Sequence, residues 1–396
     1  MNRLRVLYLD VPFENEPGGD KNRSRFLWHS LRERFETDLV LIGREGTGQR
    51  PAWTKFKPRA WLPPQPAPFP RSESTPAFAP EDRARFSALL REGDYDVVFS
   101  RFCRSWELLG LVERDSPRSS VVVDVDMLSS RLAGLSWQAR RGFRSRWYLF
   151  EKWKLTRFER RMFREPWLFL FTNPVELPSQ KEPASAAAAE FALLPNVMPV
   201  PSGPIPIACR PAILFFGSLD SAANQDAFQF LLDELMPRIQ PDLERHGVEI
   251  RVVGKNPPAR FRERLAQNPA LPVKLIGEVA SIEGAIAESL FVLLPLRIAS
   301  GTRTRILEAA AQRRAVVTTS IGKEGLDLDG AVRVGDTADD LAGQVRHLLD
   351  HPAEAQALGE ELQRRCLANY SAEKVARDLC GFVEKVIARR RSALAA

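Results

Sequence analysis

Short apolar runs, many of them rich in valine, isoleucine and leucine, alternate along the chain with longer stretches in which polar residues dominate. Such runs favour buried strands, and the stretches between them favour crossover helices, which together are typical of parallel sheets. Because several runs are apolar throughout, we expect sheets that are covered on both faces. In the first half of the chain the pattern predicts a helix over 22–34 and strands over 3–10, 38–42, 95–100, 120–126 and 167–172.

The second half repeats this pattern. Its predicted strands are 212–216, 249–253, 273–276, 291–294 and 315–319, and its predicted helices are 226–236, 259–266, 282–288, 304–312, 338–349 and 371–388. The simplest architecture is an α/β fold of two Rossmann-like domains whose parallel sheets face a central cleft.

Length and proline content suggest where the domains begin and end. A chain of 396 residues exceeds one ordinary core, and the proline-rich stretch 199–211 fits neither a helix nor a central strand. We therefore expect an N-terminal domain over 1–198, a linker over 199–211 and a second domain over 212–370. A C-terminal helix within 371–396 is expected to return to the first domain. A second proline-rich stretch, 51–80, is predicted to lack regular structure, as a surface excursion or an acceptor-facing loop.

Composition narrows the class of protein. The apolar fraction is 44% and the charged fraction 27%, as in soluble globular proteins, and no run approaches the length of a membrane-spanning helix. The first apolar run ends at Asp10 without a cleavage site, so we expect a strand and a cytoplasmic protein. Four scattered cysteines and four histidines show no metal or redox spacing. The net charge of +7 predicts an anionic partner: nucleotide phosphates, an anionic membrane or nucleic acid.

One region, 137–167, is dense in both cations and large aromatic residues. Its cations are Arg140, Arg141, Arg144, Arg146, Lys152, Lys154, Arg157, Arg160, Arg161 and Arg164, and its aromatics include Trp147, Phe150, Trp153 and Phe158. A basic helix with such aromatics can lie on an anionic membrane. Alternatively, the aromatics pack into the domain while the cations stay solvated. Nucleic acid is not expected as a partner, since no recognition motif accompanies the charge.

The most informative stretch is 293–319, which predicts a buried strand, a turn of small residues, a helix and another buried strand. Free backbone N–H groups at such a helix start, together with the helix dipole, bind phosphate. Gly301, Arg305 and Glu308 have the spacing of one helix face. The glycine admits a ligand to the backbone, the arginine can neutralise a diphosphate, and the carboxylate can accept both hydroxyls of a ribose. An ordinary amphipathic helix with an Arg/Glu pair on its wet edge would have the same spacing.

The sequence also resembles a known family over this stretch and beyond it. SGTRTRILEAAAQRRAVVTTSIGKEGLD is similar to the donor-binding segment of family 4 glycosyltransferases, which have the GT-B fold. Further similarities lie in GSLDSAANQD, in VVG at 252–254, in IGEV at 276–279 and at Tyr370-Ser371. Near the N-terminus, PGGDKNRSRFLWHSL resembles the opening of a subgroup linked to bacterial exopolysaccharide synthesis.

The resemblance implies roles for individual residues. Arg303 and Arg305 would stabilise the leaving diphosphate, and Asp126, at a strand end, would contact the acceptor. The implied donor-binding residues are Gly18, Gly19, Lys21, Gly217, Ser218, Ser300, Gly301, Thr302 and Glu308. Three features depart from the family: Ser300 replaces a frequent glutamate, Arg305 replaces a lysine, and the Arg and Lys that often follow the first strand of the second domain are missing.

The implied function is transfer of a hexose from a nucleotide-diphosphate sugar to a glycan or lipid-linked acceptor, with retention and without a metal or other cofactor. Peripheral contact with the inner face of an anionic membrane fits this function. Asp124 and Asp126 also form the Asp-x-Asp pattern that holds a metal in the GT-A fold, a weak three-residue match. Two alternatives remain open: a non-catalytic relative that binds nucleotide or glycan, and a nucleotide-sugar epimerase.

Overall fold

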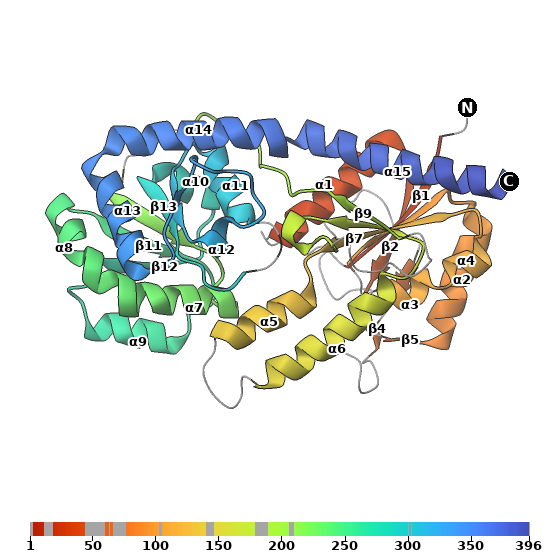
Figure 1. Cartoon of the computed structure of the whole chain (residues 1–396), viewed down its shortest axis with the longest axis horizontal. Helices are drawn as coiled ribbons and strands as arrows, with labels where there is room; N and C mark the ends of the chain where they lie inside the picture. The colour runs from red at the N-terminus through yellow and green to blue at the C-terminus, as the bar shows by residue number, and fades with distance from the viewer. Residues whose placement is uncertain are drawn as a thin grey trace. The chain divides into compact units, whose positions relative to one another are not determined.

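The computed structural model describes residues 3–11, 19–43, 60–62, 64–65, 77–102, 105–139, 146–178, 189–205, 210–299, 301 and 303–395. The chain divides into two compact units, each built around its own parallel sheet (Figure 1). The first unit comprises Met1–Ala133, Arg146–Asn196 and Ala372–Ala396, and the second comprises Gly134–Ser145 and Val197–Ser371. The α/β fold class predicted from the sequence is confirmed.

The sheet of the first unit has seven strands in the order β3-β2-β1-β6-β7-β8-β9, and neighbouring strands are parallel. Successive residues of β1 point to opposite faces, and those from Val6 to Asp10 are all buried, which confirms that the sheet is covered on both sides. The strands are β1 (Arg5–Asp10), β2 (Glu36–Ile42), β3 (Ala60–Leu62), β6 (Val97–Arg101), β7 (Ser120–Asp126), β8 (Leu168–Phe171) and β9 (Glu190–Leu193).

Helices from both ends of the chain cover this sheet. The helix α1 packs beside α15, although α15 follows it by more than three hundred residues. The helices are α1 (Gly19–Arg34), α2 (Pro80–Gly93), α3 (Trp106–Leu109), α4 (Val112–Asp115), α5 (Ser129–Ala139), α6 (Arg146–Met162), the 3₁₀ helix η3 (Pro174–Glu176) and α15 (Ala372–Ala395). The helix α5 spans the boundary between the two units.

The proline-rich stretch 51–80 contains regular structure, so the prediction that it lacks any is wrong. The strand β3 joins the edge of the sheet beside β2, and β4 (Pro64–Gln65) pairs with β5 (Ala77–Phe78) in an antiparallel ribbon. These strands have two or three residues each, and proline is tolerated at such an edge because a free edge needs no backbone donor. Residues 51–59, 63 and 66–76 lie outside the described part of the chain.

The sheet of the second unit has six strands in the order β12-β11-β10-β13-β14-β15. Numbered from its own first strand, this order is 3-2-1-4-5-6, the order of the doubly wound dinucleotide-binding fold. The strands are β10 (Ala212–Phe216), β11 (Glu249–Val253), β12 (Val273–Gly277), β13 (Phe291–Leu294), β14 (Val316–Thr318) and β15 (Arg333–Val334). Strand neighbours are parallel, as the sequence predicted.

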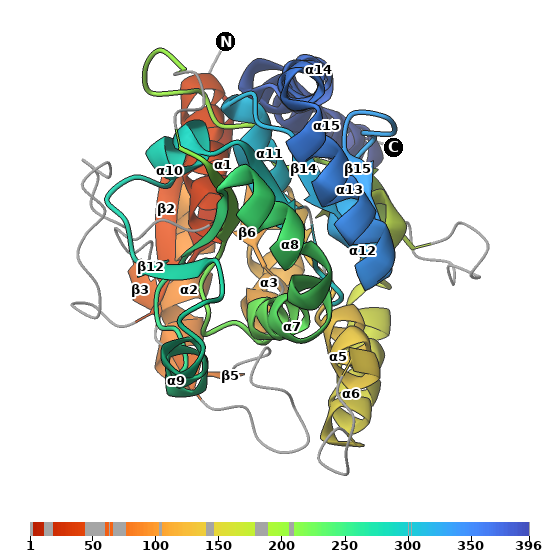
Figure 2. The ribbon, with the colours of Figure 1, turned by 90° about the vertical axis from the view of Figure 1, so that its left-hand side faces the viewer.

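Helices cover both faces of this second sheet. In Figures 1 and 2, α8 lies beside α13, and α11 lies beside α10 and α14. The helices are α7 (Ala222–Phe230), the π-helical turn η4 (Leu231–Leu235), α8 (Met236–His246), α9 (Ala259–Gln267), α10 (Ile282–Glu288), α11 (Thr304–Ala311), α12 (Ser320–Lys323), α13 (Ala338–Asp350) and α14 (Pro352–Tyr370). No helix among the described residues is long and apolar enough to cross a membrane.

One helical prediction for this unit is wrong in extent, and one helix was not predicted. The predicted helix 226–236 ends before Pro237, but the chain stays helical from Ala222 to His246, because the π-helical turn η4 lies directly before Pro237 and changes the backbone hydrogen bonding there. The helix α14 was not predicted at all. Its polar residues outnumber its buried ones, and its burial against α11 depends on the tertiary fold.

Candidate functional site

The strand order of the second unit places a binding position at the carboxyl ends of β10 and β13. These strands are neighbours, and the chain leaves them in opposite directions across the sheet. In doubly wound sheets a crevice opens at this reversal, and ligands bind there. The loops that follow the two strands contain the Gly217-Ser218 turn and the turn before α11, which are two of the predicted donor-binding segments.

Two glycines shape the turn after β10. Gly217 has a φ of 141°, and a side chain there would press on Asn224 and Arg305. A Cβ on Gly254, at the end of β11, would collide with the Gly217 carbonyl oxygen. Asn224, in α7, fixes the turn through its Nδ2, which donates to the carbonyl oxygen of Ser218 over 2.7 Å. The backbone at Gly217 is therefore held tightly, and other residues approach it closely.

The turn before α11 is held by Arg303. Gly301 has a φ of 71°, in the left-handed region, and lies outside the helix, which begins at Thr304. The prediction that Gly301 shares a helix face with Arg305 and Glu308 is therefore wrong, because the chain turns between them. Arg303 is 5% exposed, and its guanidinium donates to the carbonyl oxygens of Gly301 and, over 3.1 Å, of Ile321.

Arg305 and Glu308 lie three residues apart on α11, and both are partly exposed. Arg305 Nη1 donates to the carbonyl oxygen of Phe216 over 2.9 Å, which fastens α11 to the end of β10. Burial lowers the pKa of Arg305 to about 10, against an opposing effect of Glu308. Burial also raises the pKa of Glu308, and Arg305 opposes that shift. Arg305 thus lies beside the Gly217 turn, and Glu308 lies close enough to Arg305 to affect its pKa, so an anionic ligand with hydroxyl groups could bind both.

The remaining predicted donor residues divide between the described and undescribed parts of the chain. Ser218 follows Gly217 in the turn. Ser300, Thr302 and Gly18 lie outside the described residues. Gly19 is the first residue of α1, and Lys21 lies in the first turn of that helix.

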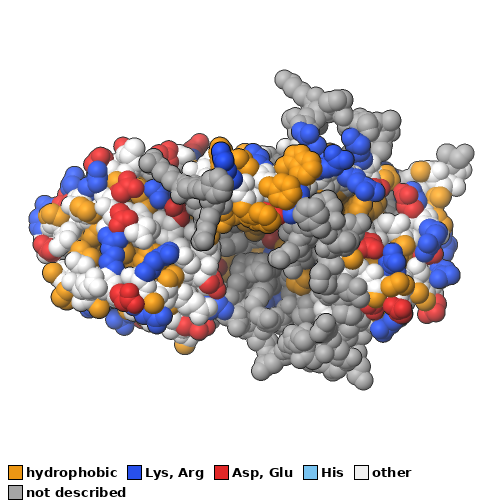
Figure 3. Space-filling model, turned by 90° about the horizontal axis from the view of Figure 1, so that it is seen from below, with side chains coloured by type: hydrophobic (Ala, Val, Ile, Leu, Met, Phe, Trp, Pro, Cys, Tyr) orange, Lys and Arg blue, Asp and Glu red, His pale blue; other side chains and the backbone are white. Residues whose placement is uncertain are grey.

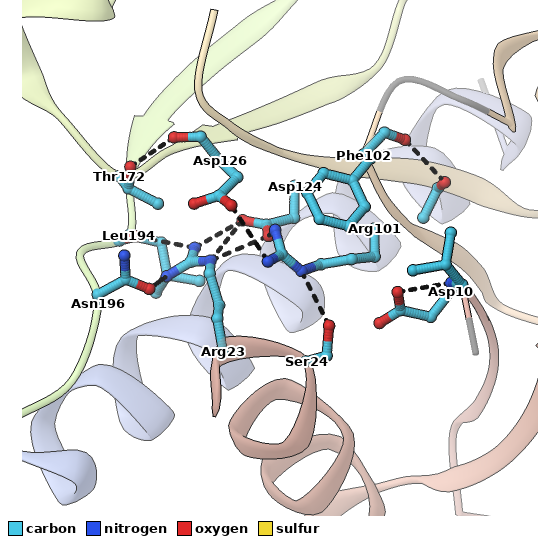
Figure 4. Close-up of polar contacts among 12 residues, drawn as sticks. Asp10, Arg23, Ser24, Arg101, Phe102, Asp124, Asp126, Thr172, Leu194 and Asn196 are labelled. Carbon is cyan, nitrogen blue, oxygen red and sulfur yellow. Dashed lines mark hydrogen bonds and ion pairs between the residues drawn. The ribbon is translucent and has the colours of Figure 1, made fainter. Parts of the chain in front are cut away.

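The first unit contains a buried cluster of charged residues at the same edge of its own sheet (Figure 4). Arg23, on α1, donates through Nε and Nη2 to the carboxylate of Asp124, with contacts of 2.5–3.2 Å. It also donates to the carbonyl oxygens of Leu194 and Pro195 and to Asn196 Oδ1, over 2.9–3.1 Å. One arginine thereby joins α1, β7 and the segment that leaves the unit.

A second arginine, Arg101 at the end of β6, holds both carboxylates of the Asp-x-Asp pattern. Its Nη1 donates to Asp124 over 2.7 Å, and its Nη2 donates to Asp126 over 3.2 Å. Burial alone would raise the pKa of Asp124, but Arg23 and Arg101 outweigh it and hold the pKa below its ordinary value. Asp126 has a φ of 60° and a 9% exposed side chain, so its carboxylate lies at the edge of the cluster.

Asp10, at the end of β1, completes the cluster. Tyr8 Oη donates to Asp10 Oδ2 over 2.6 Å, and the backbone N–H of Val11 donates to Oδ1 over 2.7 Å. Burial raises the pKa of Asp10 to about 7, although Arg101 opposes the shift. Sequence reasoning missed Asp10, Arg23 and Arg101 as a group. Arg23 falls within the segment PGGDKNRSRFLWHSL, and the resemblance of that segment to a glycosyltransferase subgroup was the one signal that pointed to it.

The cluster bears on the metal-binding interpretation of the Asp-x-Asp pattern. Asp124 is completely buried, and two arginines occupy its carboxylate oxygens. A cation would have to displace them, since the charge of the carboxylate is already compensated. Across the described part of the chain, no group of three or more His, Cys, Asp and Glu side chains is arranged to hold a metal ion.

Comparisons with known proteins place the second unit in a family. Residues 210–351 match the family model described as glycosyl transferases group 1. This segment runs from the start of β10 to the end of α13 and includes the Gly217 turn and α11. No curated protein matches the sequence.

Solved structures resemble the whole chain. Sucrose-phosphate synthase from Thermosynechococcus elongatus superposes with a TM-score of 0.65 at 16% identity, covering 98% of this chain and 100% of that one. HepE from Anabaena, in complex with UDP and glucose, gives 0.62 at 14% identity, covering 96% and 99%. The α,α-trehalose 6-phosphate synthase from Burkholderia multivorans gives 0.62 at 12% identity, covering 100% of both chains.

These likenesses show the GT-B fold, and the family match confirms the prediction of a glycosyltransferase. The chain is thus a glycosyltransferase of the GT-B fold that contains a glycosyl transferase group 1 domain over residues 210–351.

Proposed function

We propose that the chain transfers a hexose from a nucleotide-diphosphate sugar to a glycan or lipid-linked acceptor, in the synthesis of exopolysaccharide or another surface glycan. The observation that best supports this is the placement of Arg305 beside the Gly217 turn, at the carboxyl ends of β10 and β13, with Glu308 next to Arg305 on α11. This position combines a glycine turn, a cation and a carboxylate. A nucleotide sugar offers a diphosphate and ribose hydroxyls to match them.

Arg305 is the proposed contact for the diphosphate. One of its guanidinium nitrogens is used by the Phe216 carbonyl oxygen, so the planar fork is already oriented before a ligand arrives. A pKa of about 10 keeps the side chain protonated at neutral pH, and a bound diphosphate would offset the cost of its burial. The N-terminus of α11 adds backbone N–H groups and a favourable dipole.

Glu308 is the proposed contact for the ribose. A carboxylate can accept one hydrogen bond from each hydroxyl of a vicinal diol, which fixes the nucleoside relative to the diphosphate. Arg303 is assigned a supporting role, because its guanidinium already holds the Gly301 turn. The first unit is proposed to supply Gly18, Gly19 and Lys21 to the donor and Asp126 to the acceptor.

The proposed transfer needs no metal and no other cofactor. Departure of the diphosphate requires positive charge close to its oxygens, and in the second unit Arg305 and the start of α11 supply that charge. We assign no protein nucleophile and propose that the anomeric configuration is retained.

Glu308→Ala and Arg305→Ala test the assignment. Titration calorimetry with a panel of nucleotide-diphosphate sugars, carried out in EDTA, is expected to identify a donor that the native protein binds. Each variant is expected to bind it about 10- to 100-fold more weakly, as loss of a charged hydrogen bond costs about 1.5–3 kcal/mol. Glu263→Ala and Arg262→Ala, on the exposed side of α9, are the matched controls. Native affinity in Glu308→Ala would rule out the ribose contact.

A second candidate function is the binding of nucleotide or glycan without catalysis, as in a non-catalytic relative of the glycosyltransferases. It is favoured by the internal contacts of Arg303, which leave fewer cations for a diphosphate, and by Ser300 in place of a glutamate. The two candidates differ in turnover. Release of the nucleotide diphosphate during incubation with donor and acceptor supports the transferase. Donor binding without any release supports the non-catalytic binding protein.

The proposal includes a location for the acceptor. A lipid-linked acceptor resides in a membrane, so we place the enzyme peripherally at the inner face of the cytoplasmic membrane, in contact with anionic lipid.

A further inference from the structure

The helix α6 is fastened to the first unit along one side. Leu155 and Met162 are buried, and Glu159 accepts hydrogen bonds from the backbone N–H and the hydroxyl of Ser130. Phe158 packs edge to face on Trp106, with 5.5 Å between ring centroids. These contacts fix the rotation of α6 about its axis, and they thereby determine which residues of α6 face outward.

The outward side begins with large apolar residues. Trp147 is 61% exposed and Trp153 57%, and Leu149 and Phe150 are 41% and 37% exposed. The three rings follow one another along the helix, with centroid distances of 5.8 Å and 6.0 Å. We call Trp147, Leu149, Phe150 and Trp153 together the aromatic stripe. Ordinary protein surfaces carry single exposed apolar residues, whereas a contiguous stripe with two tryptophans indicates a surface that contacts something else.

Cations accompany the stripe. Arg146, Lys152, Arg157 and Arg160 are exposed on the same helix, whereas Arg161 lies over the Trp106 ring of the anchored side. Lys154 lies with Nζ 5.0 Å from the centre of the Phe150 ring and pairs with Glu151. The only other acid of α6 is Glu159, which is buried against Ser130. In Figure 3, which views the molecule from the side where α6 lies in Figure 1, large hydrophobic side chains stand next to Lys and Arg side chains.

We infer that the aromatic stripe and the cations of α6 form a surface that binds the interface of an anionic phospholipid bilayer. Tryptophan rings settle at the depth of lipid headgroups, and arginine and lysine reach the phosphates around them. Phe158, the fourth aromatic of the sequence pattern, belongs instead to the anchored side. This surface would bring the enzyme to a lipid-linked acceptor. The binding of lipid follows from α6 itself, and only the identity of the acceptor rests on the proposed function.

Vesicle flotation of the full-length protein tests the surface. Native protein is expected to float at least tenfold more with vesicles of phosphatidylcholine and phosphatidylglycerol than with phosphatidylcholine alone. The double variant W147S/W153S is expected to lose most of this binding, and R157S/R160S is expected to lose the preference for the anionic lipid. Leu367→Ser is the matched control, since Leu367 is 49% exposed on α14, far along the chain from the aromatic stripe.

A spectroscopic readout guards against misfolded variants. Brominated acyl chains are expected to quench native tryptophan emission and to quench W147S/W153S far less, while donor binding by calorimetry stays native in both. Absence of native flotation, or equal flotation after W147S/W153S, would overturn the inference. So would a native dimer that dissociates in W147S/W153S, because the stripe would then bind a second copy. Lipid binding with no donor binding would instead contradict the proposed function alone.

Discussion

At the scale of single residues, close backbone contact decides the shape of the candidate donor site. Gly217 and Gly254 come from neighbouring strands, and the carbonyl oxygen of Gly217 fills the space that a side chain at 254 would need. Gly217 in turn lies against Asn224 and Arg305. A change at Gly254 is therefore transmitted to the proposed diphosphate contact, although Gly254 does not touch it directly.

Gly254→Ala tests this transmission. The added methyl group must displace the Gly217 carbonyl, so we expect destabilisation of about 1–3 kcal/mol, as for overpacking in a core, together with weaker donor binding. Thermal unfolding and calorimetry measure the two effects. Gly343→Ala, on α13 with open space around its Cβ, is expected to be neutral or stabilising by up to about 1 kcal/mol. Equal stability of the two variants would contradict the contact.

At the scale of elements, a cluster of buried charged residues links the strands of the first unit to α1. Asp10 ends β1, Arg23 lies on α1, Arg101 ends β6, and Asp124 and Asp126 end β7. If all five were ionised, three carboxylates would face two guanidinium groups. Because the pKa of Asp10 is raised to about 7, its protonation balances the cluster below pH 7.

This balance predicts a pH dependence of stability. The unfolded chain releases the Asp10 proton near pH 4 and the folded chain near pH 7, so the free energy of unfolding should fall as pH rises between them. The Asp10 contribution amounts to at most about 4 kcal/mol and is constant above pH 7. The Asp10→Asn side chain has nearly the same shape as that of Asp10 but does not titrate. We expect native protein to lose stability relative to Asp10→Asn from pH 4 to 7 in urea titrations, and a pH-independent difference would refute the assignment.

At the scale of the whole molecule, the last helix belongs to the unit in which the chain began. Five apolar residues of α15, from Val375 to Ile387, are buried. Arg390 donates to the carbonyl oxygen of Pro117 over 2.7 Å, and Arg391 donates to Asp96 over 2.7 Å. The first unit thus depends on residues that are translated after the whole of the second.

Removal of residues 372–396 is expected to destabilise the first unit selectively. Each buried aliphatic side chain contributes roughly 1.5–3 kcal/mol, so the loss should exceed the stability of many domains. Calorimetry should show the first unit's transition lowered or missing, and limited proteolysis should cut first within 3–196. Truncation after Ala393 removes Leu394, which is 54% exposed, and the residues that follow it, and serves as the control. Loss of both transitions to the same extent would mean that the units fold as one.

Much of the fold could be predicted because its signals are local. Apolar runs placed β10, β11 and β13 at their observed bounds, and α10 and the start of α11 followed from helical periodicity. The short strands in the proline-rich stretch and the helix α14 escaped prediction, because pairing of β3 with β2, pairing of β4 with β5 and burial against α11 create them.

The candidate site shows the same division between local and tertiary information. By itself, the sequence determined that residues 293–319 form a strand, a turn and a helix with Arg305 and Glu308 on it, since turn and helix signals lie within a few residues of one another. Only the tertiary structure decided that Arg305 fastens to Phe216, that Gly301 lies before the helix and that Arg23 binds Asp124. The two arginine contacts join residues far apart in the chain, and the Gly301 turn is held in part by Arg303, which also bonds to Ile321. The order of strands sets them, and no local pattern encodes that order.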